Sequence, residues 1–240
     1  LQNNATTIVA AAKGHKEYLI QHEKIKRSKI EVIHNGVDPA RTRSELSQAE
    51  ARAKFSLPEK ANIITQIAAL RPDKAHMIML KALAVLIREL PDTILLLAGD
   101  GSERNNIERK ITELSLHKHC RLLGNQRNIG DVIIASDLIA LSSNPEQETL
   151  SVAAIEAMFG GKPVVSTHVG FMDEIVLNSE TGLLVPPQSP QKLADTFIKI
   201  LQDENGRKRM GQNGVKHVTK LCHVSVMTEK FECLFKKIIQ

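Results

Sequence analysis

The chain has 240 residues, of which 42% are hydrophobic and 25% charged, and its formal net charge is +5. This length suffices for one good-sized core, and the composition is that of a globular rather than a disordered protein. Aromatic residues make up only 3%, with one Tyr and no Trp, so stacking platforms for bases are scarce and no nucleic-acid partner is expected. The mild excess of positive charge suits a phosphate-bearing small ligand or an anionic membrane surface equally well.

The cysteines and the apolar runs suggest where the protein works. Cys120, Cys222 and Cys233 are widely scattered and lack the close spacing of a zinc site or a secreted disulfide framework, which predicts a reducing, cytoplasmic setting. No run reaches the roughly 20 apolar residues of a membrane span, because Asp131 and Asp137 interrupt the most hydrophobic region. The first residues include neither an initiator Met nor a signal pattern, so we interpret the chain as cut from a longer protein.

The first 58 residues show little regular pattern. Residues 1–38 contain one helical pattern around residues 15–22 and one short strand in "IEVIHNGVD", which is too little for a domain. We therefore expect these residues to be the tail of an otherwise missing N-terminal domain. Residues 39–58, "PARTRSELSQAEARAKFSLP", are charged and helix-prone, and we interpret them as a connector.

Strand-like and helix-like segments alternate through residues 59–223. The expected strands lie in "NIITQIAAL", "DTILLLAGD", "CRLLG", "DLIALSS", "KPVVST" and "TGLLVPP", and the expected helices cover residues 76–90, 103–116, 129–135, the segment around residue 156, and 171–177. This alternation predicts an α/β fold, a Rossmann-like doubly wound parallel sheet covered on both faces.

The end of the chain is helical. Apolar residues recur at spacings of three and four over residues 190–201, 205–221 and 224–239. We expect these extra C-terminal helices to pack on the sheet or extend past it. Residues 224–240 are predicted to be a helix that crosses back toward the missing domain, and its exposed face is expected to favour a homodimer of the isolated fragment.

Basic side chains follow the first strand of the predicted sheet. Ligands of doubly wound sheets bind beyond the carboxyl ends of the strands, and "RPDKAH" places Arg71 and Lys74 at such an end. Guanidinium and ammonium groups there could clamp a diphosphate. The alternative is a solvated basic loop, which these two residues taken alone favour.

A carboxylate interrupts an apolar helix in "PEQETLSVAAIEAMFGGKPVV", residues 145–165. Glu156 lies among alanines and large apolar residues, where an ionised carboxylate is costly unless something donates hydrogen bonds to it. Sugar hydroxyls at a crevice are suitable donors, and Glu148 in the preceding loop could hold the other end of the same ligand while the helix N-terminus receives an anion. Alternatively, Glu156 pairs with a core Arg or Lys, or faces water.

Taken together, these motifs resemble the C-terminal domain of GT-B fold, family 4 retaining glycosyltransferases. "ETLSVAAIE" matches the E-x7-E motif of that family with Glu148 and Glu156, and "VIHNGVD", "LLLAGDGSER" and "CRLLGNQRNIGDVIIASDLIALSS" are similar to the segments that precede it, in the same order. The resemblance extends from residue 29 nearly to the C-terminus.

The resemblance implies donor binding and retaining transfer from a nucleotide-diphosphate sugar. It assigns the ribose hydroxyls to Glu156 and the donor sugar to Glu148, which would orient the sugar during catalysis. Lys74 would stabilise the departing diphosphate. The nucleobase is expected near residues 125–127, which end in Arg127. The implied donor-binding residues are Arg71, Lys74, Arg127, Glu148, Thr149, Leu150, Ser151 and Glu156. No cofactor and no metal are expected.

Two positions depart from the family pattern. Ala69 stands where many members have a phosphate-binding Arg, and Arg71 is the residue that could replace it. The loop after Glu148 reads "TLS" where many members have glycines, so Thr149 and Ser151 narrow the space beside the phosphates. These differences favour an alternative function, that of a non-catalytic nucleotide-sugar-binding or interaction module of GT-B ancestry.

The resemblance leaves the partners of the whole enzyme open. UDP- and GDP-sugars both fit the motifs, and the acceptor, a glycan or a lipid, would bind through the missing N-terminal domain. We therefore expect this chain to bind a donor without efficient transfer by itself. The full enzyme is expected in the cytoplasm, with peripheral contact at the inner face of the membrane. A GT-B enzyme of another reaction, such as a sugar-nucleotide epimerase, matches the E-x7-E context less well.

Overall fold

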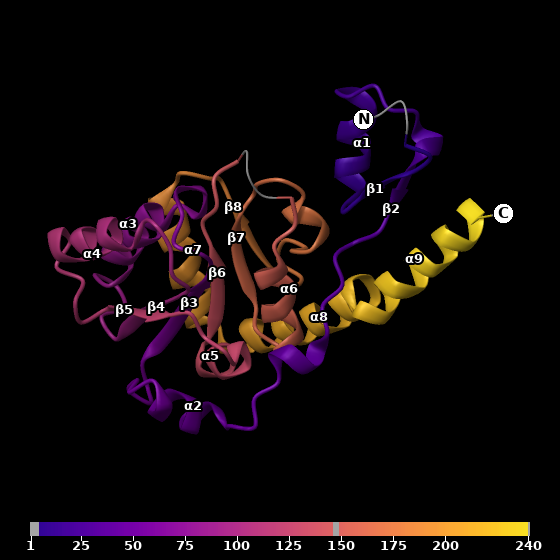
Figure 1. Cartoon of the computed structure of the whole chain (residues 1–240). Coiled ribbons are helices and arrows are strands. Elements are labelled where there is room, and N and C mark those ends of the chain that lie inside the picture. The colour runs from indigo at the N-terminus through magenta and orange to yellow at the C-terminus, as the bar shows by residue number, and fades with distance from the viewer. Residues whose placement is uncertain (1–4, 146–148, 240) are drawn as a thin grey trace.

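A computed structural model of the chain describes residues 5–145 and 149–239 (Figure 1). Its centre is a six-stranded sheet in which every neighbouring pair of strands is parallel, in the order β5-β4-β3-β6-β7-β8. The strands are β3 (Asn62–Ile67), β4 (Thr93–Ala98), β5 (Cys120–Gly124), β6 (Leu138–Leu141), β7 (Val164–Thr167) and β8 (Gly182–Val185). Each predicted strand segment contains one of these strands, so the predicted doubly wound α/β sheet is confirmed.

The central strands of the sheet are largely apolar because both faces of the sheet are covered. In β4, Leu95 and Leu97 point into one core cluster, while Ile94 and Leu96 point into another on the opposite face. Alternate residues of a strand face opposite sides, so a sheet buried on both sides needs an almost continuous apolar run. This explains why "TILLLA" contains no charged residue.

Helices form a layer on each face of the sheet (Figure 1). One layer is made of α3 (His76–Leu86), α4 (Arg104–Glu113) and α7 (Pro190–Gln202), which share a core cluster with alternate strand residues. The other is made of α2 (Gln48–Lys54), α5 (Ile129–Ala135), α6 (Val152–Phe159) and α8 (Glu204–Cys222). The segment interpreted as a connector thus supplies α2, which packs against α5.

Two details of the predicted secondary structure are wrong. The helix expected over residues 171–177 is only a 3-10 turn, η4 (Met172–Glu174), because the Leu177 N–H bonds the Thr181 hydroxyl (2.9 Å) and the chain turns there toward β8. The N-terminal segment contains two strands instead of one, β1 (Ile8–Ala10) and β2 (Ile30–Val32), paired in parallel around α1 (Lys13–Gln21). Three-residue strands carry too little periodicity to be recognised from sequence.

The N-terminal unit, residues 5–32, is joined to the sheet domain by the half-buried carboxylate of Glu174. Glu174 of η4 accepts hydrogen bonds from the backbone N–H groups of Lys13 (3.0 Å) and Gly14 (2.7 Å), in the first turn of α1. His34 Nε2 lies 2.9 Å from Glu174 Oε2, and the His34 side chain is almost fully buried. A carboxylate at a helix N-terminus is favourable because of the exposed N–H groups there. One side chain of the sheet domain therefore holds both α1 and the segment after β2.

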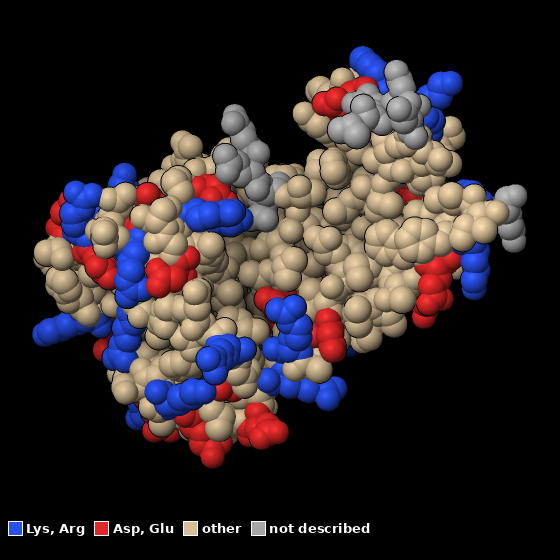
Figure 2. Space-filling view, viewed as in Figure 1, with Lys and Arg blue, Asp and Glu red and all other residues tan. Residues whose placement is uncertain are grey.

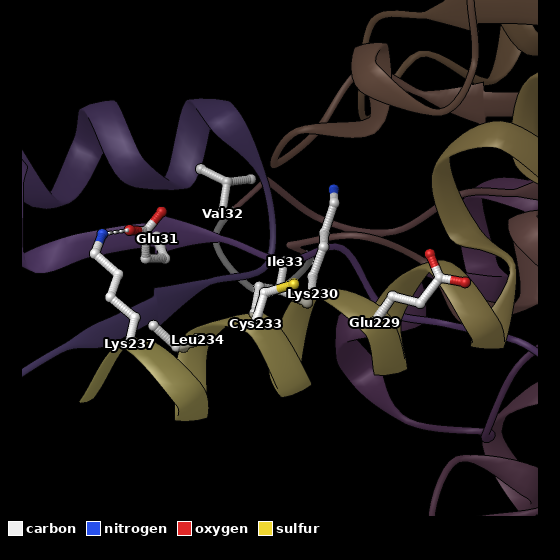
Figure 3. A pocket seen from close by; sticks show the side chains of 8 residues that line it. All are labelled: Glu31, Val32, Ile33, Glu229, Lys230, Cys233, Leu234 and Lys237. Atoms are coloured by element: carbon white, nitrogen blue, oxygen red, sulfur yellow. Dashed lines mark hydrogen bonds and ion pairs between the residues drawn. The ribbon is translucent and has the colours of Figure 1, made fainter. Parts of the chain in front are cut away.

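The last helix, α9 (Val224–Ile239), leaves the sheet and runs along the N-terminal unit (Figure 1). A groove of about 440 Å³ lies between α9 and the β2 segment. At one end of it Lys237 and Glu31 form an ion pair (3.1 Å; Figure 3). Gly36 lies against Met227 and Val224, where an added Cβ would come within 2.9 Å of both. The region between the two units is therefore closely packed at the start of α9 and more open toward its end.

A serine in left-handed conformation ends α4, which leads to a testable prediction about stability. Ser115 (φ 56°) donates its N–H to Thr112 (3.0 Å), and Leu116 donates to Ile111 (2.9 Å), the pattern of a Schellman cap. Glycine adopts this conformation without strain, and Ser115 is exposed. Ser115→Gly should raise the free energy of unfolding by about 0.5–1 kcal/mol in urea titrations. Ser115→Ala is the control, and a gain of the same size with alanine would contradict the argument.

Candidate functional site

The site lies where the order of the strands reverses direction along the sheet. From β3 the chain proceeds outward to β4 and β5, and then returns to β6 on the other side of β3. The loops that follow adjacent strands β3 and β6 therefore meet at one edge, the usual ligand-binding position of such sheets. They are hydrogen-bonded to each other: Asn144 N donates to Asp73 O (2.8 Å), and the Ser142 hydroxyl donates to Lys74 O (2.9 Å). Gln66 Nε2 also donates to Lys74 O (2.9 Å).

Both predicted phosphate-binding cations lie in the loop after β3, and an acidic residue stands between them. Asp73 of η3 (Pro72–Lys74) accepts two hydrogen bonds from Arg71, at 3.0 and 2.9 Å, and lies 3.5 Å from Lys74 Nζ. Burial alone would raise the pKa of Asp73, but the Arg71 hydrogen bonds and the charge of Lys74 outweigh it and lower the pKa. Arg71 is therefore held by Asp73, whereas Lys74 faces the same carboxylate at a longer distance.

The start of α6 forms the other side of this edge. The Ser151 hydroxyl accepts from Ala154 N (3.4 Å) as the N-cap, Leu150 is buried, and the exposed Thr149 accepts from Phe171 N (3.0 Å). Within the described residues, the N–H groups of Leu150 and Ser151 donate to no protein acceptor. The predicted role of Glu148 concerns a position outside the described residues. The N-terminus of α6 thus presents unpaired donors at the end of the connection that follows β6.

Glu156 lies in the middle of α6, facing a cavity. Glu156 is 7% exposed, and its side chain helps to line a cavity of about 300 Å³. The other residues that line this cavity are Arg41, Ile67, Gln126, Arg127 and Ile129. Arg41 Nη2 lies 3.6 Å from Glu156 Oε1. Burial raises the pKa of Glu156, and the charge of Arg41 acts in the opposite direction. The sequence suggested either a crevice or a basic partner for Glu156, and the structure shows both. The basic partner, Arg41, lies at the surface, whereas the sequence suggested one in the core.

The predicted nucleobase segment separates this cavity from a second one. Gln126 lines both cavities, Arg127 lines the first, and Asn125 lines the second. The second cavity, about 420 Å³, extends past Gly99 and past Ala69, the position where an arginine was expected from the resemblance. Gly99 (φ 144°) has no room for a side chain, because a Cβ would lie 2.1 Å from Ala68 O. Both cavities lie at the carboxyl end of β3, where Ile67 lines each of them.

The structure brings together several of the predicted residues in two groups. Arg71 and Lys74 form one group in the loop after β3, and Glu156 and Arg127 form the other around a shared cavity. Sequence reasoning missed Arg41, because nothing in the charged stretch "ARTR" indicates a contact with a residue more than a hundred positions away. It also missed Asp73, although an acidic residue between two candidate phosphate ligands in "RPDK" could have been recognised as their competitor.

Surface charge, the grouping of metal-ligating residues and hydropathy add three limits. On the face shown in Figure 2, Lys and Arg are interspersed with Asp and Glu and form no continuous basic surface. Within residues 5–145 and 149–239, no group of three or more His, Cys, Asp or Glu side chains is placed to hold a metal ion. No helix in the described part of the chain is long and apolar enough to cross a membrane.

Comparison with known proteins gives a consistent result. The family model described as glycosyl transferases group 1 matches residues 47–217. N-acetyl-alpha-D-glucosaminyl L-malate synthase of Bacillus anthracis is 27% identical over 233 residues, which cover 97% of this chain and 60% of that protein. The chain therefore spans less than two thirds of the length of this relative.

Solved structures share the fold. A glycosyltransferase from Rickettsia africae superposes with a TM-score of 0.91 at 24% identity, covering 98% of this chain and 64% of that one. Anabaena HepE in complex with UDP superposes with a TM-score of 0.88 at 24% identity, covering 98% and 65%. HepE has also been solved in complex with UDP-glucose. The described architecture is thus that of the C-terminal part of GT-B glycosyltransferases.

Proposed function

Because the chain belongs to the glycosyl transferases group 1 family, we propose that it binds a nucleotide-diphosphate sugar for retaining sugar transfer to an acceptor. The observation that carries this proposal is Glu156, a buried carboxylate that faces a cavity at the carboxyl ends of the strands. A buried carboxylate needs donors, and the two hydroxyl groups of a ribose supply them. HepE, which shares the fold, binds UDP and UDP-glucose.

The diphosphate is proposed to lie between Lys74 and the start of α6. The ammonium group and the free N–H groups of Leu150 and Ser151 are suitable partners for phosphate oxygens. As the bond from sugar to phosphate breaks, negative charge grows on the departing diphosphate, and these groups stabilise it. The donor sugar is assigned to Glu148, which remains a prediction, and no metal or cofactor is required by this scheme.

A second candidate function is a nucleotide-sugar-binding module that does not catalyse transfer. The observation that favours it is the hydrogen-bonded pair of Arg71 and Asp73, since Arg71 was expected to replace the arginine absent at position 69. An arginine held by a neighbouring carboxylate contributes less to phosphate binding. Under this alternative the donor binds weakly and its sugar is not transferred.

The remaining parts of the proposal concern the whole enzyme. The acceptor, a glycan or a lipid, would bind through residues outside this chain, so we expect the chain alone to transfer sugar poorly. Phe235 and Ile238 of α9 are exposed apolar residues that would favour a homodimer. The free cysteines Cys120, Cys222 and Cys233 suit the cytoplasm, where the enzyme would act at the inner face of a membrane.

Ligand titration tests the proposed function. Thermal unfolding of the chain would be followed with UDP, GDP, ADP and their sugar conjugates. A ligand at about 100 times its dissociation constant should stabilise the chain by about 2.7 kcal/mol. Stabilisation by one of these nucleotides supports the proposal and identifies the donor class. If none of them binds, either to this chain or to a longer version that includes the preceding domain, the proposal is wrong.

Glu156→Gln is the matched control for this titration. Because burial raises the pKa of Glu156 in the folded chain, its protonated form favours folding at low pH, and this contribution is lost as the pH rises through the folded pKa. At neutral pH a neutral glutamine should therefore not lower the stability of the ligand-free chain. The nucleotide-dependent stabilisation should fall sharply, because hydrogen bonds to the charged carboxylate are lost.

A further inference from the structure

An arginine outside the predicted site reaches the proposed ribose carboxylate. Arg41 belongs to η2 (Pro39–Thr42), the turn between the N-terminal unit and α2. Its Nη2 atom lies 3.6 Å from Glu156 Oε1, and the two side chains line the same cavity together with Arg127. The Arg41 side chain is 70% exposed, whereas that of Glu156 is 9% exposed. A surface arginine therefore stands at the mouth of the cavity, next to a buried carboxylate inside it.

The backbone that carries Arg41 is firmly placed. The Asp38 carboxylate accepts from Ala40 N (2.9 Å), and the buried Thr42 hydroxyl donates to Pro39 O (2.9 Å). Residues 42 and 43 also lie directly against α5. A Cβ added to Gly130 of α5 would lie only 2.2 Å from the carbonyl oxygen of Arg43. The turn is thus packed against α5 and α6, and the Arg41 side chain lines the cavity.

The distance between Arg41 and Glu156 decides what the pair does. At 3.6 Å the contact is too long for a hydrogen bond, so it acts through charge alone. Within residues 5–145 and 149–239, no group donates a hydrogen bond to the Glu156 carboxylate. Its lone pairs therefore remain available to a ligand while its charge is partly balanced. A hydrogen-bonded salt bridge would instead compete with the ligand.

We propose that Arg41 is a positioning residue of the donor site, which orients the Glu156 carboxylate toward the cavity so that it accepts the ribose hydroxyls of a nucleoside diphosphate. This inference rests on the proposed function. Burial raises the pKa of Glu156 and Arg41 opposes that shift, which agrees with a role in keeping the carboxylate able to accept. Arg127 is the other charged residue lining the cavity. Arg41 therefore contributes to the binding of the nucleoside end of the ligand and makes no contribution to the binding of the diphosphate.

Isothermal titration calorimetry with UDP, GDP and inorganic pyrophosphate tests this assignment. Arg41→Ala should weaken the binding of the preferred nucleotide by about three- to fivefold, the range of an ion pair with one exposed partner. Arg41→Lys should restore most of the affinity, because it keeps the charge. Arg43→Ala removes an exposed arginine from the same segment and should bind like the wild type. Pyrophosphate affinity should be unchanged in all three variants.

A double-mutant cycle provides the decisive comparison. If Arg41 acts through Glu156, then Arg41→Ala should have no further effect in a Glu156→Gln background. An equal loss in both backgrounds, a parallel loss of pyrophosphate binding, or unchanged or tighter nucleotide binding by Arg41→Ala would overturn the inference while the proposed function stands. If neither this chain nor the longer version binds any of the nucleotides tested above, the proposed function is overturned, and this inference with it.

Discussion

Replacing Lys74 with alanine is expected to weaken the binding of a nucleoside diphosphate by about 10- to 100-fold, which corresponds to about 1.5–3 kcal/mol for hydrogen bonds from a charged group. Lys74 is well placed for this role, because Gln66 and Ser142 both hold its carbonyl oxygen and its side chain is only 16% exposed. A donor positioned before the ligand arrives loses little side-chain freedom on binding. Calorimetric titration with UDP and with uridine would measure the effect, since uridine lacks the diphosphate and should bind both forms equally.

Lys81→Ala is the matched control for Lys74→Ala. Lys81 is an exposed residue of α3, seven positions further along the chain, so its replacement removes the same charge at a distance from the strand ends. It should leave the dissociation constant within about twofold of the wild type. Equal losses in both variants would mean that net charge, and not the position of Lys74, governs affinity. Arg71→Ala should cost less than Lys74→Ala, because Asp73 already engages Arg71.

Replacing Asp137 with alanine is expected to lower the free energy of unfolding by about 3 kcal/mol, as when one partner of a buried ion pair is removed. Asp137 Oδ2 accepts from Arg52 Nη2 (2.9 Å) and from Ile63 N (2.7 Å) at the start of β3. Arg52 is 9% exposed and also donates to the carbonyl oxygens of Ala135 (3.1 Å) and Glu59. The substitution leaves a buried guanidinium without its counter-ion. Urea denaturation would measure the loss.

The same cluster contains a further buried cation. Burial lowers the pKa of Lys162 to about 8, and the charge of Asp137 is the contribution that opposes this. Without Asp137, Lys162 and Arg52 would repel each other in a poorly solvated region, so the loss of stability should be larger at pH 7 than at pH 9, where Lys162 is mostly neutral.

An exposed ion pair serves as the comparison for Asp137→Ala. Arg104 and Glu108 on α4 are in contact at 3.0 Å, but both are well exposed. Glu108→Ala should change stability by no more than about 0.5 kcal/mol, because water screens such pairs. Asp137→Asn, which keeps an acceptor for Ile63 N, should fall between the two. If Asp137→Ala and Glu108→Ala have similar effects, the burial argument is wrong.

The architecture was predictable because its signals are local. The run in β4 is apolar at five consecutive positions, Ile94 to Ala98, which indicates a strand buried on both faces. The helices α5 and α9 have the bounds predicted from periodicity. The predictions were wrong where the local pattern was weak or ambiguous. The three-residue strand β1 is too short to show a pattern. The helical spacing of Met172, Ile175 and Val176 predicted a helix, but these buried residues lie in a 3-10 turn and directly after it.

The sequence by itself determined the class of sheet, the family resemblance and the positions of Lys74 and Glu156 at strand ends or on a helix, because period and order along the chain carry that information. Only the tertiary structure decided which charges meet. Asp73 holds Arg71, and Arg41 reaches Glu156 across 115 positions. The strength of a charge pair depends on distance and burial, and both follow from how helices pack on a sheet. Neither quantity can be read from spacing along the chain.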